Sequence, residues 1–318
     1  MTVRGRFAPS PSGRMHLGNL FSALLAWLDV RSRGGVMLLR IEDLDPDRCS
    51  REKAALLLED LRWLGLDWDE GGLEPDWMQS CRGDHYRAAF ERLRAMDLVY
   101  PCRCTRSQRL AASAPHRGEG HGAGTCPCAA LSPGEQAALI RAGCAWRLRV
   151  PDRWVEAKEE HMGPCGENLR RDCGDYLIRR SDGVWAYQLA VVADDAAMGV
   201  TRVVRGCDLL SSAPRQVWLH SVLGYEPPVF CHVPLLVDRA GRRLSKRDGD
   251  LDMGALRLRY TPEELLGVLG CLAGQLDRPE PVSLRELTDG FDWSRVPRTD
   301  IPADGLSEII HREGQGRC

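Results

Sequence analysis

Residues 4–19 read RGRFAPSPSGRMHLGN. The stretch combines an apolar strand start, a turn rich in proline, serine and glycine, and a helix that opens on His16, Gly18 and Asn19. After it, residues 20–31 have the broad apolar face of a helix that stops at Gly34, and residues 36–41 form a continuous apolar run typical of a buried parallel strand. The order strand, helix, strand predicts a βαβ unit, whose ligands lie at the carboxyl ends of the strands.

The start of the expected helix is a candidate phosphate site. Its first backbone N–H groups lack intrahelical partners and carry partial positive charge. Ser12, Gly13 and Gly18 are small enough for a ligand to approach the backbone, while His16 and Asn19 can each add a donor to a phosphoryl oxygen. The alternative is an ordinary strand-turn-helix connection, because a short motif by itself has a high false-positive rate.

Acidic side chains stand where the second strand ends. Glu42, Asp43 and Asp45 follow the apolar run directly. They are either ligand-binding groups at the edge of the sheet or a solvated acidic turn, and the residues alone leave both open for Asp43 and Asp45. Residues 51–64 and 85–96 are expected to be amphipathic helices that pack on the sheet.

The totals describe a globular protein. The 318 residues allow two domains, hydrophobic residues make up 43% and charged residues 28%, and the net charge is −2. RNA contacts would therefore need local basic patches, of which residues 238–247 form the densest. No apolar run approaches the ~20 residues of a membrane span, and the N-terminus does not resemble a signal peptide, so we expect a cytoplasmic protein without membrane contact.

Residues 102–128 form an insertion rich in cysteine, glycine and arginine, with Cys102, Cys104, Cys126 and Cys128 as two Cys-x-Cys pairs. In a reducing cytosol, clustered cysteines indicate a metal, and four thiolates can hold a tetrahedral zinc. A segment with so little apolar content would gain its missing folding energy from the metal. The alternative is free cysteines in a loop. Isolated cysteines, among them Cys144, Cys207, Cys231 and Cys271, are expected to be small buried hydrophobes.

The second half of the chain again predicts mixed elements. A capping box at residues 132–135 starts a helix to about residue 141, and residues 146–150 alternate as a strand. Residues 175–180 and 184–192 are expected to form a hairpin, followed by a helix over 213–223 and a strand over 232–237. A capping box at 261–264 begins one further helix, with an irregular tail behind it.

Tyr187 and Arg205 are expected on neighbouring strands, where a phenol and a guanidinium could form a carboxylate pocket. The residues alone equally allow Tyr187 in the core and Arg205 as a surface charge.

Two short motifs together resemble the signatures of class I aminoacyl-tRNA synthetases. The first is His16-Leu17-Gly18-Asn19, the second is Arg243-Leu244-Ser245-Lys246-Arg247. The run over residues 6–13 is similar to the glutamyl and glutaminyl branch of that family. The resemblance implies a Rossmann-like domain that binds ATP with magnesium, with His16, Gly18, Asn19 and Lys246 around the phosphates and with His16, Asn19 and Lys246 as catalytic residues.

The resemblance also implies an L-glutamate site. Its residues would be Arg6, Ser10, Glu42, Tyr187 and Arg205, with Glu42 meeting the amino group. The family's glutamyl-queuosine branch holds a zinc through a Cys-x-Cys pair, a tyrosine and a last cysteine. This chain keeps Cys102, Cys104 and Cys126 but has Gly122 at the tyrosine position. Cys128 is our first choice for the fourth ligand, His121 the second and a water the third.

The run Arg205-Gly206-Cys207-Asp208-Leu209-Leu210 resembles that same branch, as does the segment 291–297. From the length of residues 248–318, we expect the helical anticodon-binding domain of a full glutamyl-tRNA synthetase to be missing. The resemblance implies transfer of activated glutamate to the queuosine base in the anticodon of tRNA(Asp), by a monomer. Alternatives are a shortened enzyme acting on tRNA(Glu), an RNA- or glutamate-binding paralogue without catalysis, and a small-molecule nucleotidylyltransferase.

The expected fold is therefore α/β: a Rossmann-like parallel sheet, an inserted α/β acceptor-type subdomain with a zinc loop, and a short helical C-terminal part. We expect the first half of the catalytic domain over 1–98, the insertion over 99–175, the second half over 176–237, and the lysine loop with a helical tail over 238–318.

Overall fold

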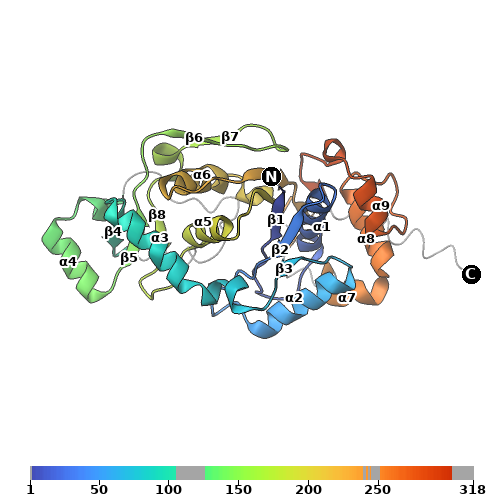
Figure 1. The fold of residues 1–318 in the computed structure, drawn as a ribbon, viewed down its shortest axis with the longest axis horizontal. Helices are drawn as coiled ribbons and strands as arrows, with labels where there is room; N and C mark the ends of the chain where they lie inside the picture. The colour runs from blue at the N-terminus through green and yellow to red at the C-terminus, as the bar shows by residue number, and fades with distance from the viewer. Residues whose placement is uncertain (1, 105–125, 239–240, 243, 245–250, 303–318) are drawn as a thin grey trace, which may run out of the picture.

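The computed structural model describes residues 2–104, 126–238, 241–242, 244 and 251–302. Lys246 and His121 lie outside the described residues. Figure 1 shows an elongated molecule with a central sheet, a smaller α/β part around β4, β5 and α4 at one end, and the helices α8 and α9 at the other.

The central sheet has five parallel strands in the order β10-β9-β1-β2-β3. Their bounds are β1 Arg4–Phe7, β2 Val36–Leu39, β3 Glu70–Gly71, β9 Arg202–Gly206 and β10 Val229–Val233. The helix α1 (Leu17–Arg31) connects β1 to β2, so the predicted βαβ unit and the parallel α/β fold class are confirmed. The sheet places residues from distant parts of the chain side by side at one edge.

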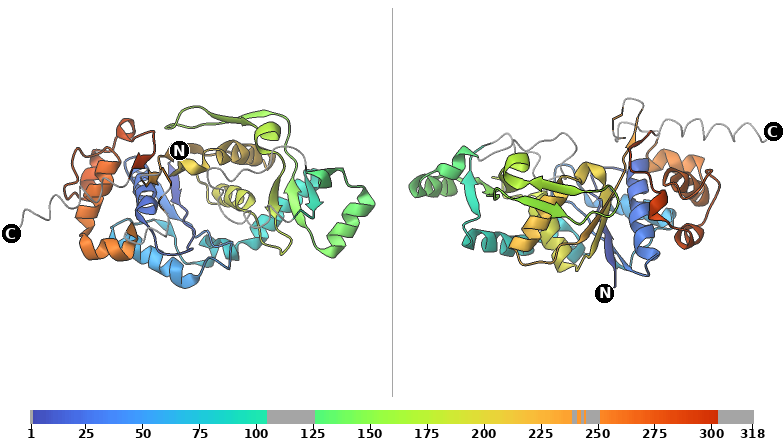
Figure 2. Two further views of the ribbon diagram at one scale, coloured as in Figure 1. Left: turned by 180° about the vertical axis from the view of Figure 1, so that it is seen from behind. Right: turned by 90° about the horizontal axis from the view of Figure 1, so that it is seen from above.

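Helices cover both faces of the sheet (Figure 2). On one face, α1 packs with α2 (Arg51–Trp63), α8 (Pro262–Leu272) and α9 (Leu284–Asp289) in the largest apolar cluster. On the other face, Leu38, Val203 and Phe230 of the strands contact Ala213 of α6 (Ser212–Val222). Burial of both faces explains why β2 is a continuous apolar run in the sequence.

The inserted part is antiparallel. The strands β4 (Val99–Cys102), β5 (Ala145–Leu148) and β8 (Tyr176–Arg179) form a three-stranded sheet, and β6 (Trp154–Ala157) pairs with β7 (Cys165–Asn168) as a separate ribbon. The helix α4 (Pro133–Ala142) belongs to this part and begins with the expected capping box at Ser132 and Glu135. The helix α3 (Gly83–Ala95), which precedes β4, shares an apolar cluster with β8 and with the helix over Tyr187–Ala197.

The prediction of a strand over residues 184–192 is wrong. Residues Tyr187–Ala197 form the helix α5, in which every residue from Tyr187 to Asp195 is buried. A helix buried on all sides has the same continuous apolar sequence as a buried strand, so periodicity could not separate the two. Tyr187 and Arg205 accordingly do not lie on neighbouring strands: one begins a helix and the other lies in β9.

The expected strand over 232–237 is divided into β10 and β11 (Leu236–Val237), with Pro234 between them. Proline has no N–H to donate to a neighbouring strand. The tail also contains more structure than expected. In addition to α8, it forms α7 (Met253–Arg259), α9 and β12 (Ile301–Pro302), which pairs with β11. No helix among the described residues is both long and apolar enough to cross a membrane.

Truncating Leu24 tests the packing of α1. Leu24 has no exposed surface, and we expect Leu24→Ala to lower the free energy of unfolding by about 2–5 kcal/mol because it leaves a cavity. Leu258 on α7 is 89% exposed, and Leu258→Ala is the matched control, with an effect within about 0.5 kcal/mol. Urea denaturation measures both. Equal losses for the two variants would contradict this placement of α1.

Candidate active site

One cavity of about 640 Å³ opens at the carboxyl ends of β1 and β9, beside the start of α1. Its lining includes every sequence-predicted ATP and glutamate residue that the structure describes: Arg6, Ser10, His16, Gly18, Asn19, Glu42, Tyr187 and Arg205. Leu244, two residues before Lys246, also lines it. The structure thus brings the predicted residues together, while their individual roles stay predictions.

His16 is the N-cap of α1, and its ring orientation is defined by its own helix. The Nδ1 atom accepts the Gly18 N–H at 3.2 Å, while the Asn19 side-chain oxygen accepts the His16 N–H at 3.2 Å. Because Nδ1 accepts, the neutral ring carries its proton on Nε2, and that atom is a donor. The Asn19 amide keeps its NH₂ group as a second donor. The helix N-terminus therefore presents donors of the kind that bind phosphate.

A buried charge network lies at the inner end of the cavity. The guanidinium of Arg40 contacts Asp195 at 2.6 Å and Glu42 at 3.0 Å, and it lies 3.7 Å from Asp194. Arg6 pairs with the same Asp195 at 3.4 Å. Burial raises the pKa of Glu42 although Arg40 and Arg6 act to lower it. The contact with Arg40 holds the Glu42 carboxyl group in place at the cavity.

Sequence reasoning did not identify Arg40, Asp194 and Asp195 as part of this network. A signal was available, because a charge at the end of an apolar strand and two consecutive carboxylates in a buried helix all need partners. The two aspartates that follow β2 have different surroundings. Asp43 accepts the backbone N–H and the hydroxyl of Ser80 at 2.8 and 2.6 Å and stabilises a turn, whereas Asp45 lines the cavity.

Arg205 points its charge into the cavity from β9. Its Nη1 donates to Gln216 at 2.8 Å, its Nη2 to the carbonyl of Leu209 at 3.2 Å, and its Nε to Nε2 of His232 at 3.0 Å. Among the described residues, no carboxylate lies within 4 Å of this guanidinium to form an ion pair. Arg205 is only 6% exposed, so it is not a surface charge.

Tyr187 is also buried, and burial raises the pKa of its phenol. It interacts electrostatically with Arg205, Glu42 and Arg6, which places the phenol among the predicted glutamate residues. The pair therefore lines one pocket, although it comes from a helix and a strand rather than from two strands.

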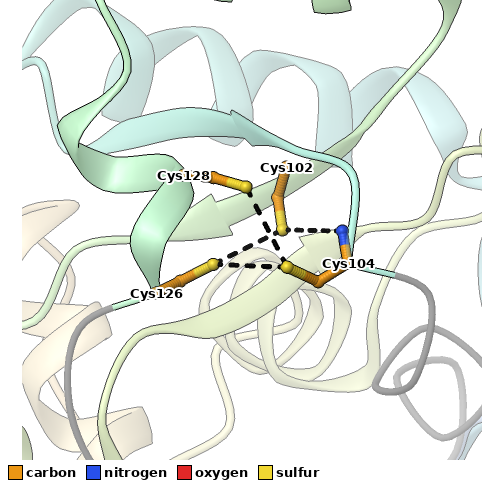
Figure 3. A group of neighbouring side chains, drawn as sticks. All are labelled: Cys102, Cys104, Cys126 and Cys128. Atoms are coloured by element: carbon orange, nitrogen blue, oxygen red, sulfur yellow. Dashed lines mark hydrogen bonds between the residues drawn. The ribbon is translucent and has the colours of Figure 1, made fainter.

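The four cysteines of the insertion converge outside this cavity (Figure 3). Cys102 ends β4 with Cys104 just beyond it, and Cys126 and Cys128 come from the short helical turn that includes Pro127–Ala130. Their sulfur atoms lie within 4.8 Å of one another, with separations of 3.7 Å for Cys102–Cys126, 3.7 Å for Cys104–Cys126 and 3.9 Å for Cys104–Cys128.

These separations fit a metal. Four thiolates around a tetrahedral zinc at a Zn–S distance of ~2.3 Å lie roughly 3.8 Å apart. The group could therefore hold a metal ion with Cys128 as the fourth ligand. Of the isolated cysteines, Cys207 and Cys231 are buried as expected, whereas Cys144 and Cys271 are only partly buried.

The parallel sheet, the helix start at His16 and the cavity between them are those of a class I aminoacyl-tRNA synthetase catalytic domain. The family model of tRNA synthetases class I (E and Q), catalytic domain, matches residues 2–296. The chain belongs to this family, and it is accordingly an enzyme of the ligase type.

Individual relatives show which members of the family this chain is similar to. A Glutamyl-Q tRNA(Asp) synthetase of Nitratidesulfovibrio vulgaris is 44% identical over 321 residues, covering 96% of this chain and 98% of the relative. Another from Deinococcus radiodurans is 49% identical over 256 residues, covering 78% and 81%. Among solved structures, a glutamate tRNA ligase from Elizabethkingia meningosepticum in complex with its amino acid has a TM-score of 0.79 at 26% identity, covering 98% of this chain and 68% of that one.

The cysteine cluster yields a direct test. We expect the purified protein to hold one metal ion per chain, and Cys126→Ser and Cys128→Ser each to lose it, because a structural site needs all four ligands. Cys271→Ser, which changes a partly buried cysteine of α8, is the matched control and should keep the metal. Elemental analysis after desalting measures the content. Full retention in Cys128→Ser would exclude Cys128 and leave His121 or a water as the fourth ligand.

Proposed function

We propose that the enzyme activates L-glutamate with ATP and transfers it to the queuosine base in the anticodon of tRNA(Asp). In the first step, a glutamate carboxylate oxygen attacks the α-phosphorus of ATP, a P–O bond breaks, and pyrophosphate leaves. In the second, a hydroxyl of the queuosine cyclopentenediol attacks the glutamyl carbonyl carbon and AMP leaves. Such chemistry depends on positioning and on positive charge around the phosphates.

The observation that carries this proposal is the buried guanidinium of Arg205. It faces the cavity, and its three hydrogen-bond acceptors are an amide oxygen, a carbonyl oxygen and an imidazole nitrogen. A buried cation without a carboxylate in contact favours an anionic ligand, and arginine binds carboxylates through parallel N–H donors. Arg6, Ser10 and Tyr187 would complete this end of the glutamate site, and Glu42 would accept the ammonium group.

At the other end of the cavity, the donors of His16 and Asn19 and the first N–H groups of α1 would bind the phosphates, with Gly18 allowing close approach. Lys246 would contribute a further positive charge. Magnesium would enter with ATP and neutralise part of the phosphate charge. The relatives named Glutamyl-Q tRNA(Asp) synthetase support queuosine-bearing tRNA(Asp) as the acceptor, which is a cytoplasmic substrate.

We also propose that the metal of the cysteine cluster is zinc with a structural role. The four thiolates leave no ligand position for a substrate, and structural zinc sites are closed in this way. The cluster does not line the cavity, so its metal stabilises the fold of the insertion rather than taking part in the reaction.

The acceptor is tested with purified enzyme, ATP, radiolabelled glutamate and two tRNA pools, one with queuosine and one without. We expect label only on queuosine-containing tRNA(Asp). Selective oxidation of the queuosine cis-diol with periodate, after the tRNA 3′ end has been blocked, is the control and should abolish labelling. Label on tRNA(Glu) would instead identify a shortened glutamyl-tRNA synthetase, and adenylate without transfer would exclude the proposed acceptor.

The lysine loop is tested by ATP–pyrophosphate exchange. We expect Lys246→Ala to lower glutamate-dependent exchange by about 100-fold or more, because it removes a charge that stabilises the transition state. Glutamate binding, measured by calorimetry, should stay nearly unchanged. Lys158→Ala is the matched control, since Lys158 is 71% exposed on the side of the protein formed by the β6–β7 ribbon. An unchanged exchange rate would remove Lys246 from the mechanism.

A further inference from the structure

A line of three buried polar side chains lies behind the carboxylate pocket. It runs from Glu159, just after β6, through His232 of β10 to Arg205 of β9. His232 and Arg205 are direct partners in the parallel register of the two strands. The side chains of Glu159 and His232 have no exposed surface. Neither residue lines the cavity, and the hydrogen bond between His232 and Arg205 connects them to its lining.

The Glu159 carboxylate defines which nitrogen of His232 carries the proton. Its Oε1 accepts the backbone N–H groups of His161 and Met162 at 2.9 Å each and of His232 at 3.1 Å. Its Oε2 lies 2.6 Å from Nδ1 of His232. A carboxylate can only accept here, so Nδ1 must be the protonated nitrogen.

The remaining nitrogen is then an acceptor. Nε2 of His232 lies 3.0 Å from Nε of Arg205, which always carries a proton, so the ring accepts that N–H. Burial lowers the pKa of His232 to about 4, although Glu159 acts to raise it, so the ring is neutral at physiological pH. A protonated ring would have no acceptor for Arg205 and would repel it.

The fixed ring orients Arg205 without neutralising it. Three N–H groups of Arg205 donate to uncharged acceptors, which are Gln216, the carbonyl of Leu209 and His232. The ring of Phe230 lies 5.0 Å from Cζ of Arg205. We infer that His232, held as the Nδ1–H tautomer by Glu159, is a positioning residue that aligns Arg205 with the carboxylate of bound glutamate. This inference rests on the glutamate specificity proposed above.

The isosteric variant Glu159→Gln tests the tautomer. The amide oxygen is needed by the three backbone N–H groups, so the amide NH₂ faces Nδ1 and forces the His232 proton onto Nε2. Two N–H donors, Nε2 of His232 and Nε of Arg205, then face each other, and the hydrogen bond between them is lost. We expect the KM for glutamate in ATP–pyrophosphate exchange to rise about tenfold, with the KM for ATP unchanged. The thermal midpoint shows whether the variant folds.

Two variants of His232 separate positioning from packing. In His232→Gln the side-chain amide reaches the position of Nε2, where its oxygen can still accept a hydrogen bond from Arg205. In His232→Asn the amide reaches only the position of Nδ1, where it can donate to Glu159 but cannot contact Arg205. We expect the glutamate KM of His232→Gln to stay within about threefold of the wild type and that of His232→Asn to rise about tenfold. A purely structural role predicts equal effects, or a smaller effect for the shorter asparagine.

The tautomer is measured without activity by NMR of ¹⁵N-histidine protein, with the His232 signal assigned by its loss in His232→Gln. An Nε2–H ring or an imidazolium at neutral pH would overturn the inference. Arg205→Lys is the reference variant. If it raises the glutamate KM while Glu159→Gln does not, the inference alone fails. If the wild type shows no glutamate-dependent exchange, the proposed function fails and this role fails with it.

Discussion

The buried guanidinium of Arg40 is the constraint on which the candidate site depends. It has no exposed surface and contacts Asp195 at 2.6 Å and Glu42 at 3.0 Å. Leaving a buried charge without its partner typically costs about 3–5 kcal/mol, a large share of the ~5–15 kcal/mol that stabilises a domain. Because Arg40 follows β2 and Asp195 lies on α5, this pairing holds the helix against the end of the strand and closes the inner end of the cavity.

Asp194, the residue before Asp195, connects this charge network to the helix α3. Asp194 accepts from Nε of Arg82 at 2.6 Å and from the hydroxyl of Tyr86 at 2.9 Å, which ties α5 to the start of α3. Asp195 at the same time pairs with Arg6 of β1. Two consecutive residues of one helix thus connect two central strands and the helix α3. A pocket built on such a network is preorganised, so little ordering is left for the ligand to induce.

The sequence predicted the parts of the fold that local rules govern. The strand-helix-strand start, the helix that opens at His16 and the capping boxes at Ser132 and Thr261 follow from short-range patterns, and the structure has each of them. The prediction failed for α5, where burial on every side removed the periodicity that distinguishes helix from strand. The site could be predicted only through family motifs, because partners such as Arg40 and Asp195 are 155 residues apart in the chain and no local pattern links them.

The charges around the cavity support the proposed preference for glutamate over glutamine, whose side chain is an uncharged amide. Arg6, Arg40 and Arg82 are paired in direct contact with the carboxylates of Glu42, Asp194 and Asp195. Arg205 has no such contact among the described residues, although the buried Asp208 of the cavity lining acts on it electrostatically. The carboxylate of Glu159 lies one neutral imidazole away from Arg205 and already accepts three backbone N–H groups. Glutamate would bring a side-chain carboxylate to Arg205, whose three hydrogen-bond acceptors are all uncharged. Glutamine would fill the same volume but leave Arg205 buried without an anion in contact, and an unpaired buried charge discriminates far more strongly than a difference in shape.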